Sequence, residues 1–334
     1  MIRSKLYITL LWFLFSCAVL VITTLAAVSF GAKEASLAAV WSAVFFYDPS
    51  ITLHTVIHDL RLPRVLGAAI TGAAFATAGA LMQGVTRNPL ADTGVLGINA
   101  GAACAVAISF AIAPSISYSL LMIISFAGAA LSTLFIVMLG LSTKGGLTSL
   151  KLTIAGSVVA AMLHSLSTGI AIYYDLSQDL AFWYAGGAAG VRWEHLRILV
   201  PLILVTLLFA FAISRPINFL SLGEETAANL GVHTGRVRVL ALAAVVVLAG
   251  ASVSVVGSIS FVGLVVPHLV RRFVGVDYRV LVPLSGLWGA ILLMWADFAS
   301  RMVNPPREFA IGAMVAIVGV PFFLYLARQE RREL

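Results

Sequence analysis

Two histidines four residues apart are the first candidates for chemistry in this chain. His54 and His58, in "HTVIHDL", would lie on one face of a helix, where two imidazoles can bind the same metal ion. The segment lacks the glutamate of a metalloprotease motif, and no third ligand is evident. We therefore expect no metal site at this position.

Nucleotide chemistry is the second candidate. The segment "TKGGLTSLK", residues 143–151, does not have the spacing of the phosphate-binding loop G-x-x-x-x-G-K-[ST]. The sequence offers no cluster of nucleophile, base and metal ligands. Cys17 and Cys104 lie within apolar runs and predict neither a disulfide nor a metal site. We expect a chain that is not an enzyme and binds no cofactor.

A polar segment at residues 221–238, "SLGEETAANLGVHTGRVR", lies between two long apolar runs. Only 10% of the 334 residues are charged, so this concentration of polar residues needs an explanation. Ser221 and Glu224 have the spacing of a capping box, which predicts a short helix beginning at Leu222.

The predicted short helix would have one mixed face and a defined end. Leu222, Thr226 and Leu230 would share a face, with Ala227 beside them, and Gly231 would end the helix. This pattern is compatible with a solvated helix that joins two spans, or with a docking surface for a cytosolic partner.

The elements that must position these residues are membrane spans. With 61% hydrophobic residues and a mean hydropathy of +1.04, the chain cannot bury its apolar surface in one soluble core. A hydrocarbon layer of about 30 Å needs roughly 20 apolar residues per helix. We predict an all-α polytopic membrane protein with about ten transmembrane helices. The predicted spans are residues 6–30, 62–84, 94–113, 117–140, 151–173, 197–214, 237–257, 259–274, 280–301 and 308–327. The first is expected to be an uncleaved helix rather than a signal peptide.

The basic residues predict the orientation, because Lys and Arg are retained on the cytoplasmic side. The eighth span, which includes "ISFVGLVVPHLV", is the weakest, but deleting it would export the basic tail "RQERREL". Ten spans place both termini and residues 221–238 in the cytoplasm. The net charge of +7 then reflects topology and requires no nucleic acid. Fourteen of the 21 basic residues fall inside: Arg3, Lys5, Arg87, Lys144, Lys151, Arg215, Arg236, Arg238, Arg271, Arg272, Arg279, Arg328, Arg331 and Arg332.

The second span carries a repeat of small residues. A small residue at every fourth position makes a smooth ridge on which another helix can pack closely. The members are Ala68, Gly72, Ala76, Ala80 and Gly84. Gln83, Arg87 and Asn88 continue into an inner loop that is a second candidate contact for the partner.

A few polar residues lie within the predicted spans. His164 and Asn99 are candidates for a solute path, because such groups face a protein interior or a wet cavity. Asp297 is expected to pair with Arg301 one turn later. His268, which follows Pro267, is expected to pack or to satisfy a carbonyl freed by the proline.

Four strings in one order resemble the permease subunits of ABC importers for iron-siderophore complexes, haem and cobalamin. They are "RLPRVLGAAITGAAFATAGALMQGVTRNPLADTGVLGINAGA", "SLGEETAANLGV", "GSISFVGLVVPHLVRR" and "PPREFAIGAMVAIVGVPFFLYL", which together extend from residue 61 to residue 326. The resemblance implies a fold like that of the cobalamin importer permease. It also implies two permease subunits, identical or closely related, with the translocation path between them.

The resemblance implies roles for the polar segment. In that family, the matching loop forms short helices that seat in a cleft of the ATPase subunit. We therefore expect one permease domain over residues 1–334, with a coupling segment at about 216–236. The residues expected to contact the ATPase are Ser221, Leu222, Gly223, Glu224, Glu225, Ala228, Leu230 and Gly231.

Arg61, Arg64 and Arg307 lie outside in the predicted topology, against the charge rule. Each could be an anchor whose charged end reaches the membrane surface. The resemblance implies that they dock an extracytoplasmic substrate-binding protein, because matching arginines in that family receive its glutamates.

The expected function is translocation of a ferric siderophore across the cytoplasmic membrane, with ATP and Mg²⁺ bound by the partner ATPase. Haem and cobalamin are the alternative solutes. An ion-coupled secondary transporter is a further alternative, but it would need several buried carboxylates, and only Asp297 qualifies.

Overall fold

The fold was examined in a computed structural model that describes residues 2–30, 35–142, 149–305 and 307–330. Three residues of the charge count, Lys144, Arg331 and Arg332, lie outside this part of the chain, as does most of residues 143–151. The described residues form helices and no strands. This confirms the predicted all-α class.

Ten of the described helices correspond to the ten predicted spans. They are α1 (Ile2–Ser29), α4 (Leu62–Thr86), α5 (Ile98–Ile112), α6 (Tyr118–Ser142), α7 (Ser149–Tyr173), α9 (Trp193–Ala212), α12 (Thr234–Val256), α13 (Val262–Val274), α14 (Tyr278–Met302) and α15 (Ile311–Glu330). Seven segments are long and apolar enough to cross a membrane, and α5 and α15 are shorter apolar helices. The weakest predicted span is α13, with only 13 residues.

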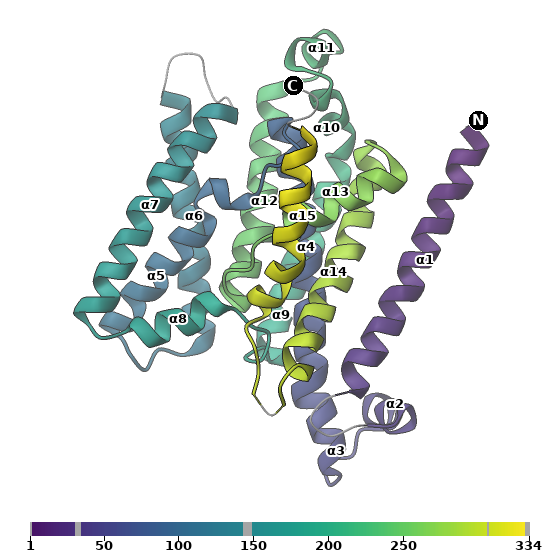
Figure 1. The fold of residues 1–334 in the computed structure, drawn as a ribbon, viewed down its shortest axis with the longest axis vertical. Helices are drawn as coiled ribbons and strands as arrows, with labels where there is room; N and C mark the ends of the chain where they lie inside the picture. The colour runs from purple at the N-terminus through teal and green to yellow at the C-terminus, as the bar shows by residue number, and fades with distance from the viewer. Residues whose placement is uncertain (1, 31–34, 143–148, 306, 331–334) are drawn as a thin grey trace.

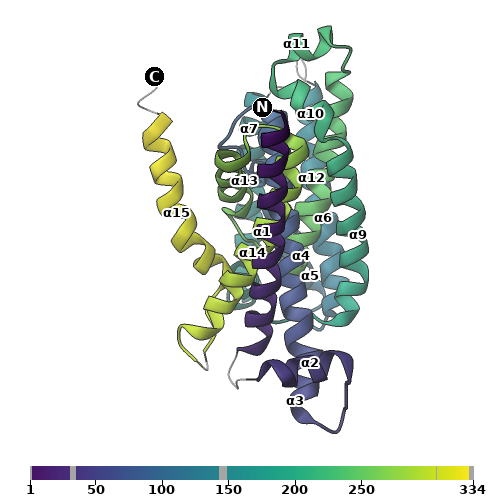
Figure 2. The same ribbon diagram turned by 90° about the vertical axis from the view of Figure 1, so that its right-hand side faces the viewer.

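The shorter elements occupy the connections. They are α2 (Leu37–Phe45), α3 (Thr52–Thr55), the π-helix η1 (Val56–Arg61), the 3₁₀-helix η2 (Thr93–Leu96), α8 (Ser177–Ala185), α10 (Ser214–Ser221) and α11 (Glu224–Asn229). Figure 1 shows α11 at the same end of the molecule as the first turn of α1 and the last turn of α15. The helices α2 and α3 lie at the opposite end (Figures 1 and 2).

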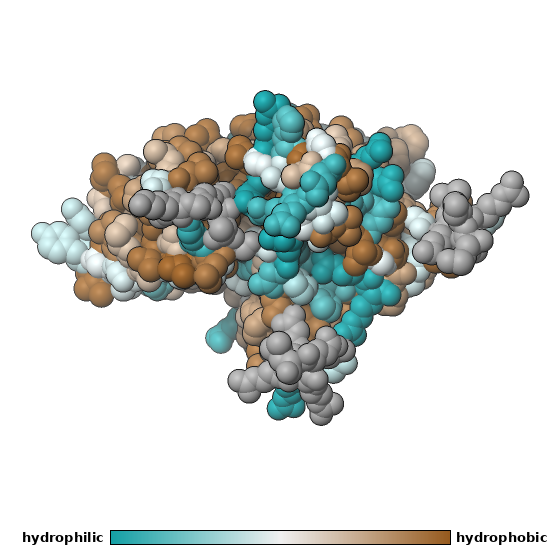
Figure 3. All heavy atoms as spheres, turned by 90° about the horizontal axis from the view of Figure 1, so that it is seen from above, coloured by the Kyte–Doolittle hydropathy of each residue, from teal (hydrophilic) through white to brown (hydrophobic). Residues whose placement is uncertain are grey.

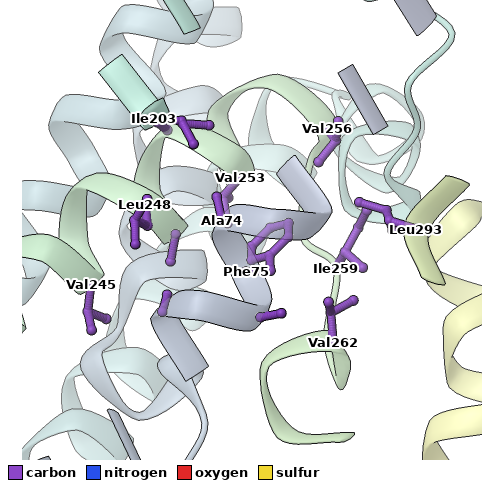
Figure 4. Close-up of a cluster of buried hydrophobic side chains, with 14 of the residues drawn as sticks. Ala74, Phe75, Ile203, Val245, Leu248, Val253, Val256, Ile259, Val262 and Leu293 are labelled. Atoms are coloured by element: carbon purple, nitrogen blue, oxygen red, sulfur yellow. The ribbon is translucent and has the colours of Figure 1, made fainter. Parts of the chain in front are cut away.

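The centre of the fold is α4, which contacts α14, α12, α13, α9 and α10. The predicted ridge packs there as expected, since Ala68, Ala76 and Ala80 are fully buried. A Cβ atom at Gly72 would overlap the carbonyl of Gly289 on α14. Such close backbone approach requires small residues. Larger side chains, including Phe75 of α4 and Leu248 of α12, fill the space beside the ridge (Figure 4).

The short length of α13 follows from a break between α12 and α13. Gly257 and Phe261 both adopt left-handed φ angles, of 75° and 71°, on either side of a non-helical stretch. The backbone groups at the break have partners: Gly187 N donates to Val256 O at 2.8 Å, and the Tyr118 hydroxyl donates to Val255 O. His268 packs edge-to-face on Phe322 of α15, with ring centroids 5.7 Å apart.

Candidate functional site

The helix α10 lies at the polar end of the molecule and packs against the last turn of α4. Ile217 and Leu220 of α10 are fully buried. A Cβ atom added to Gly84 of α4 would lie 2.5 Å from Ile217 Cγ2. Gly84 is the last member of the predicted ridge. Because it has no side chain, α10 can pack directly against α4 at this position.

A half-buried amide, that of Asn218, joins α10 to the start of α14. Asn218 Nδ2 donates to Asp277 Oδ1 at 2.7 Å, and Tyr278 N donates to Asn218 Oδ1 at 2.7 Å. Asp277 Oδ1 also accepts from Arg279 N at 3.0 Å and so caps α14. Burial alone raises the pKa of Asp277, but the hydrogen bonds from Arg279 and Asn218 hold it below its ordinary value.

The predicted capping box is wrong. Ser221 is the last residue of α10, and its hydroxyl donates to Asn218 O at 2.7 Å. The next helix begins at Glu224 rather than at Leu222. Because residues 214–221 are already helical, the chain reverses only at Gly223, whose φ of 123° is poorly accessible to other residues.

The end of α11 agrees with the prediction. Gly231 has a φ of 79°, and its N–H donates to Ala228 O at 2.9 Å. Val232 N donates to Ala227 O at 3.0 Å, which completes a Schellman motif. Ala227 is fully buried, whereas the side chains on either side of α11, Leu222 and Leu230, are 65% and 57% exposed. Two large apolar side chains are thus exposed at the most polar end of the molecule.

Glu224 holds α11 in place through contacts within the chain. It pairs with Arg238 of α12, and it lies 3.8 Å from Arg87 at the end of α4. Arg87 adopts a left-handed φ of 54°, which turns the chain out of α4. Glu225 is exposed. Figure 3 shows hydrophilic side chains gathered in the middle of this end and hydrophobic ones toward its edges.

A second polar network lies deeper, between α4, α13 and α14. Gln83 Nε2 donates to Gly263 O and Leu264 O at 3.3 and 3.4 Å. Arg271 Nη2 donates to Gln83 Oε1 at 3.0 Å and to Tyr278 Oη at 3.4 Å. Gln83 was a predicted contact for the partner, but its observed contacts are within the chain, about 180 residues away along the sequence.

At the opposite end, two of the three predicted docking arginines interact within the chain. Arg61 is only 8% exposed, and its Nη1 donates to Val28 O and Ser29 O at 2.9 and 3.1 Å. These are carbonyls of the last turn of α1, where a cation is favoured. Arg307 is exposed.

Arg64 is held by two carboxylates. Its Nε donates to Asp297 Oδ1 at 2.8 Å, and its two Nη atoms donate to Glu308 at 2.8 and 3.0 Å. The hydrogen bonds from Arg64 hold the pKa of Glu308 below its ordinary value, against the effect of burial. The predicted pairing of Asp297 with Arg301 is confirmed at 3.2 Å, although that contact is not aligned as a hydrogen bond.

The two predicted path residues lie in different places. Asn99 is half-buried in the first turn of α5. His164 is exposed on α7, with its Nδ1 3.2 Å from Tyr184 Oη. It belongs to an exposed polar stripe on α7, whose other members are Thr153, Ser157 and Thr168.

The two histidines of "HTVIHDL" contact other groups at the opposite end from α11. His54 Nδ1 accepts from Asp48 N at 3.1 Å. His58 Nδ1 lies 2.7 Å from Asp59 Oδ1, and its ring lies between those of Tyr47 and Trp193. Within the described ranges, no three His, Cys, Asp or Glu side chains are grouped to hold a metal ion.

The family of the chain follows from comparison with known proteins. The FecCD transport family matches residues 19–329. The chain belongs to the FecCD transport family. The Fe(3+)-hydroxamate import system permease FhuB of Bacillus subtilis is 48% identical over 307 residues, which are 92% of this chain and 80% of FhuB. The iron-uptake system permease FeuB of the same organism is 38% identical over 93% of both chains.

A solved structure supports the same assignment. A metal-chelate type ABC transporter in an inward-facing conformation has a TM-score of 0.83 and 26% identity, covering 98% of this chain and all of that one. This FecCD chain is therefore the permease subunit of an ABC importer for iron chelates, as expected from the four strings. The alternative of an ion-coupled secondary transporter is excluded.

Proposed function

We propose that this FecCD chain carries a ferric siderophore across the cytoplasmic membrane as one of two permease subunits, driven by a cytosolic ATPase. The observation that supports this most is the exposed pair Leu222 and Leu230 beside α11, at the end that also carries both chain ends. Two exposed leucines on an otherwise polar surface suit a protein partner rather than water.

The coupling segment, at about residues 216–236, would transmit motion through two contacts. Movement of α11 pulls on α10, which presses on Gly84 of α4 and holds the start of α14 through Asn218. The helices α4 and α14 belong to the buried core, so a shift of α10 reaches the interior. ATP and Mg²⁺ are bound by the ATPase, and this end and both termini are cytoplasmic.

A second permease subunit would complete the conduit. The exposed stripe on α7 that includes His164 is polar, and such a stripe in a membrane helix is suited to a wet path rather than to lipid. A path between two copies would give both stripes a common aqueous space. Arg307 is the exposed candidate for docking the extracytoplasmic binding protein, whereas Arg61 and Arg64 would first have to leave their partners within the chain.

The solute we propose is a ferric hydroxamate. The support is the 48% identity to a hydroxamate permease, against 38% to the general iron-uptake permease FeuB. The test is uptake of radiolabelled ferric hydroxamate, haemin and cobalamin by cells that lack other iron-chelate permeases and express this chain with its ATPase and binding protein.

We expect ATP-dependent uptake of the hydroxamate alone, and copurification of two ATPases with two permeases. Uptake of haemin or cobalamin in its place would reject the solute. Absence of a stoichiometric ATPase would reject the coupling.

A further inference from the structure

Between α1 and α4 the chain forms the short helix α2, which has no part in the function described above. Its sequence "LAAVWSAVF" carries no charge, and Ser36 caps it by accepting from Ala39 N at 3.2 Å. Figures 1 and 2 show α2 beside the end of α1 that is away from the N-terminus, lying across the direction of the spans. A helix in this position runs along a membrane surface rather than through it.

The two faces of α2 differ in their surroundings. Val40 and Ala43 are 5% and 0% exposed, and α2 contacts α1, α3 and η1. Leu37, Trp41 and Phe45 follow one another at intervals of four residues on the other face, and each is more than 60% exposed. The rings of Trp41 and Phe45 lie 4.3 Å apart.

The helix α2 contacts α1, which also exposes large apolar side chains. On α1, Val21, Ile22 and Leu25 are 58%, 64% and 44% exposed, as expected for side chains that face lipid. Large exposed apolar patches on proteins mark contacts with other proteins or with membranes. Contact with the lipid-facing helix α1, the absence of charge and the presence of tryptophan all favour the lipid boundary.

We propose that the α2 aromatic face, made of Leu37, Trp41 and Phe45, is embedded in the boundary between headgroups and acyl chains of the lipid leaflet at this end of the molecule. A second copy of the chain and a docking protein are the other two occupants to be tested. The aromatic stack of Tyr47, His58 and Trp193 connects the segment that follows α2 to η1 and to the start of α9. Lipid contact at α2 therefore fixes the depth of the end that carries Arg61.

The test uses the complete transporter in nanodiscs whose lipids are brominated either near the headgroup or near the methyl end of the acyl chains. Bromine quenches nearby tryptophans, and the chain has six. Subtracting the emission of Trp41→Phe from that of wild type isolates Trp41. Trp193→Phe is the control, because Trp193 lies at the same end but is half-buried and donates to His58 O at 2.9 Å.

We expect bromine near the headgroup to quench Trp41 by about twofold, bromine near the methyl end to quench it less, and Trp193 to respond little to either. Trp41 that is insensitive to both lipids but quenched by aqueous iodide would overturn the proposal. Quenching by lipid that disappears when the binding protein is added, or when two permeases are crosslinked, would identify a protein as the occupant and also overturn it. None of these outcomes depends on which solute is carried.

Discussion

Asn218 connects the helix α10 to the membrane-spanning core through one amide group. It donates to Asp277 and accepts from the backbone N–H of Tyr278, both at 2.7 Å. An amide side chain does both at once, because it carries an NH₂ donor and a carbonyl acceptor. Removing it leaves the carboxylate and the first turn of α14 without these partners.

We predict that Asn218→Ala destabilises the folded permease by about 0.5–1.5 kcal/mol, because Asp277 and the Tyr278 N–H lose their hydrogen bonds to Asn218. In the assembled transporter, ATP hydrolysis should continue while uptake per ATP falls. Ser214→Ala is the matched control, since Ser214 also lies in α10 and its hydroxyl donates to Phe211 O, three residues earlier. Equal uptake per ATP in the two variants would contradict a transmitting role for Asn218.

The ion pair between Arg64 and Glu308 depends on pH. The Glu308 side chain is 45% exposed, and Arg64 holds its pKa below the ordinary value. A carboxyl group whose pKa is lower in the folded than in the unfolded protein stabilises the fold at pH values above its unfolded pKa. This contribution is lost as the pH falls through its folded pKa.

We predict that Glu308→Gln lowers the melting temperature at pH 7, because the charge-assisted bidentate contact with Arg64 is lost. The difference from wild type should shrink as the pH is lowered below the ordinary range of a glutamate. Melting curves of both proteins from neutral to acidic pH measure this directly. A difference that stays constant with pH would show that the charge of Glu308 is not the cause.

At the scale of elements, α4 organises the fold through its small residues. Gly79 meets Gly263 at the start of α13 so closely that a Cβ atom would overlap the Gly263 backbone. Gly72 likewise meets the backbone of Gly289 on α14, and backbone atoms cannot move aside. Gly84 instead meets side-chain atoms of Ile217 on α10 and of Tyr278 on α14.

We predict that Gly79→Ala destabilises the permease by about 1–3 kcal/mol through overpacking. Gly235→Ala is the control, because Gly235 lies in the first turn of α12 with no atom near its added Cβ. The control should be neutral or slightly stabilising, since alanine is the better helix former. Thermal unfolding in detergent compares the two variants. A Gly79→Ala protein as stable as the control would mean that α4 and α13 are not in close contact.

The spans could be predicted from the sequence because long apolar runs have no other stable conformation in a membrane. The Gly231 helix end and the Asp297–Arg301 pair are local, so spacing alone predicted them. The capping box failed because Ser221 and Glu224 carry the same spacing whether or not a preceding helix already includes Ser221. Asn218–Asp277 and Arg64–Glu308 join residues 59 and 244 positions apart, and no local pattern signals them.

At the scale of the whole molecule, the two ends differ in chemistry. One end carries α10, α11 and both described chain ends, and the other carries α2, η1 and the cluster around Arg64. The core helices α4 and α14 extend between the two ends and contact each other more extensively than any other described pair. The helix α10 contacts both α4 and α14. A displacement of α10 therefore acts directly on the two helices that reach the opposite end.

The most direct test of coupling replaces the two exposed leucines, Leu222→Ser with Leu230→Ser, in the complete transporter. Burial of a leucine contributes about 2 kcal/mol, so loss of both at an interface weakens binding by at least about 100-fold. The measurement is the affinity of the ATPase for the permease in nanodiscs, together with ATP-driven uptake of ferric hydroxamate into proteoliposomes. Asp179→Asn, which changes an exposed residue of α8 at the opposite end of the molecule, is the control. Our account predicts that the double variant loses ATPase binding and uptake while Asp179→Asn retains both within about twofold. Wild-type ATPase binding and uptake in the double variant would contradict it.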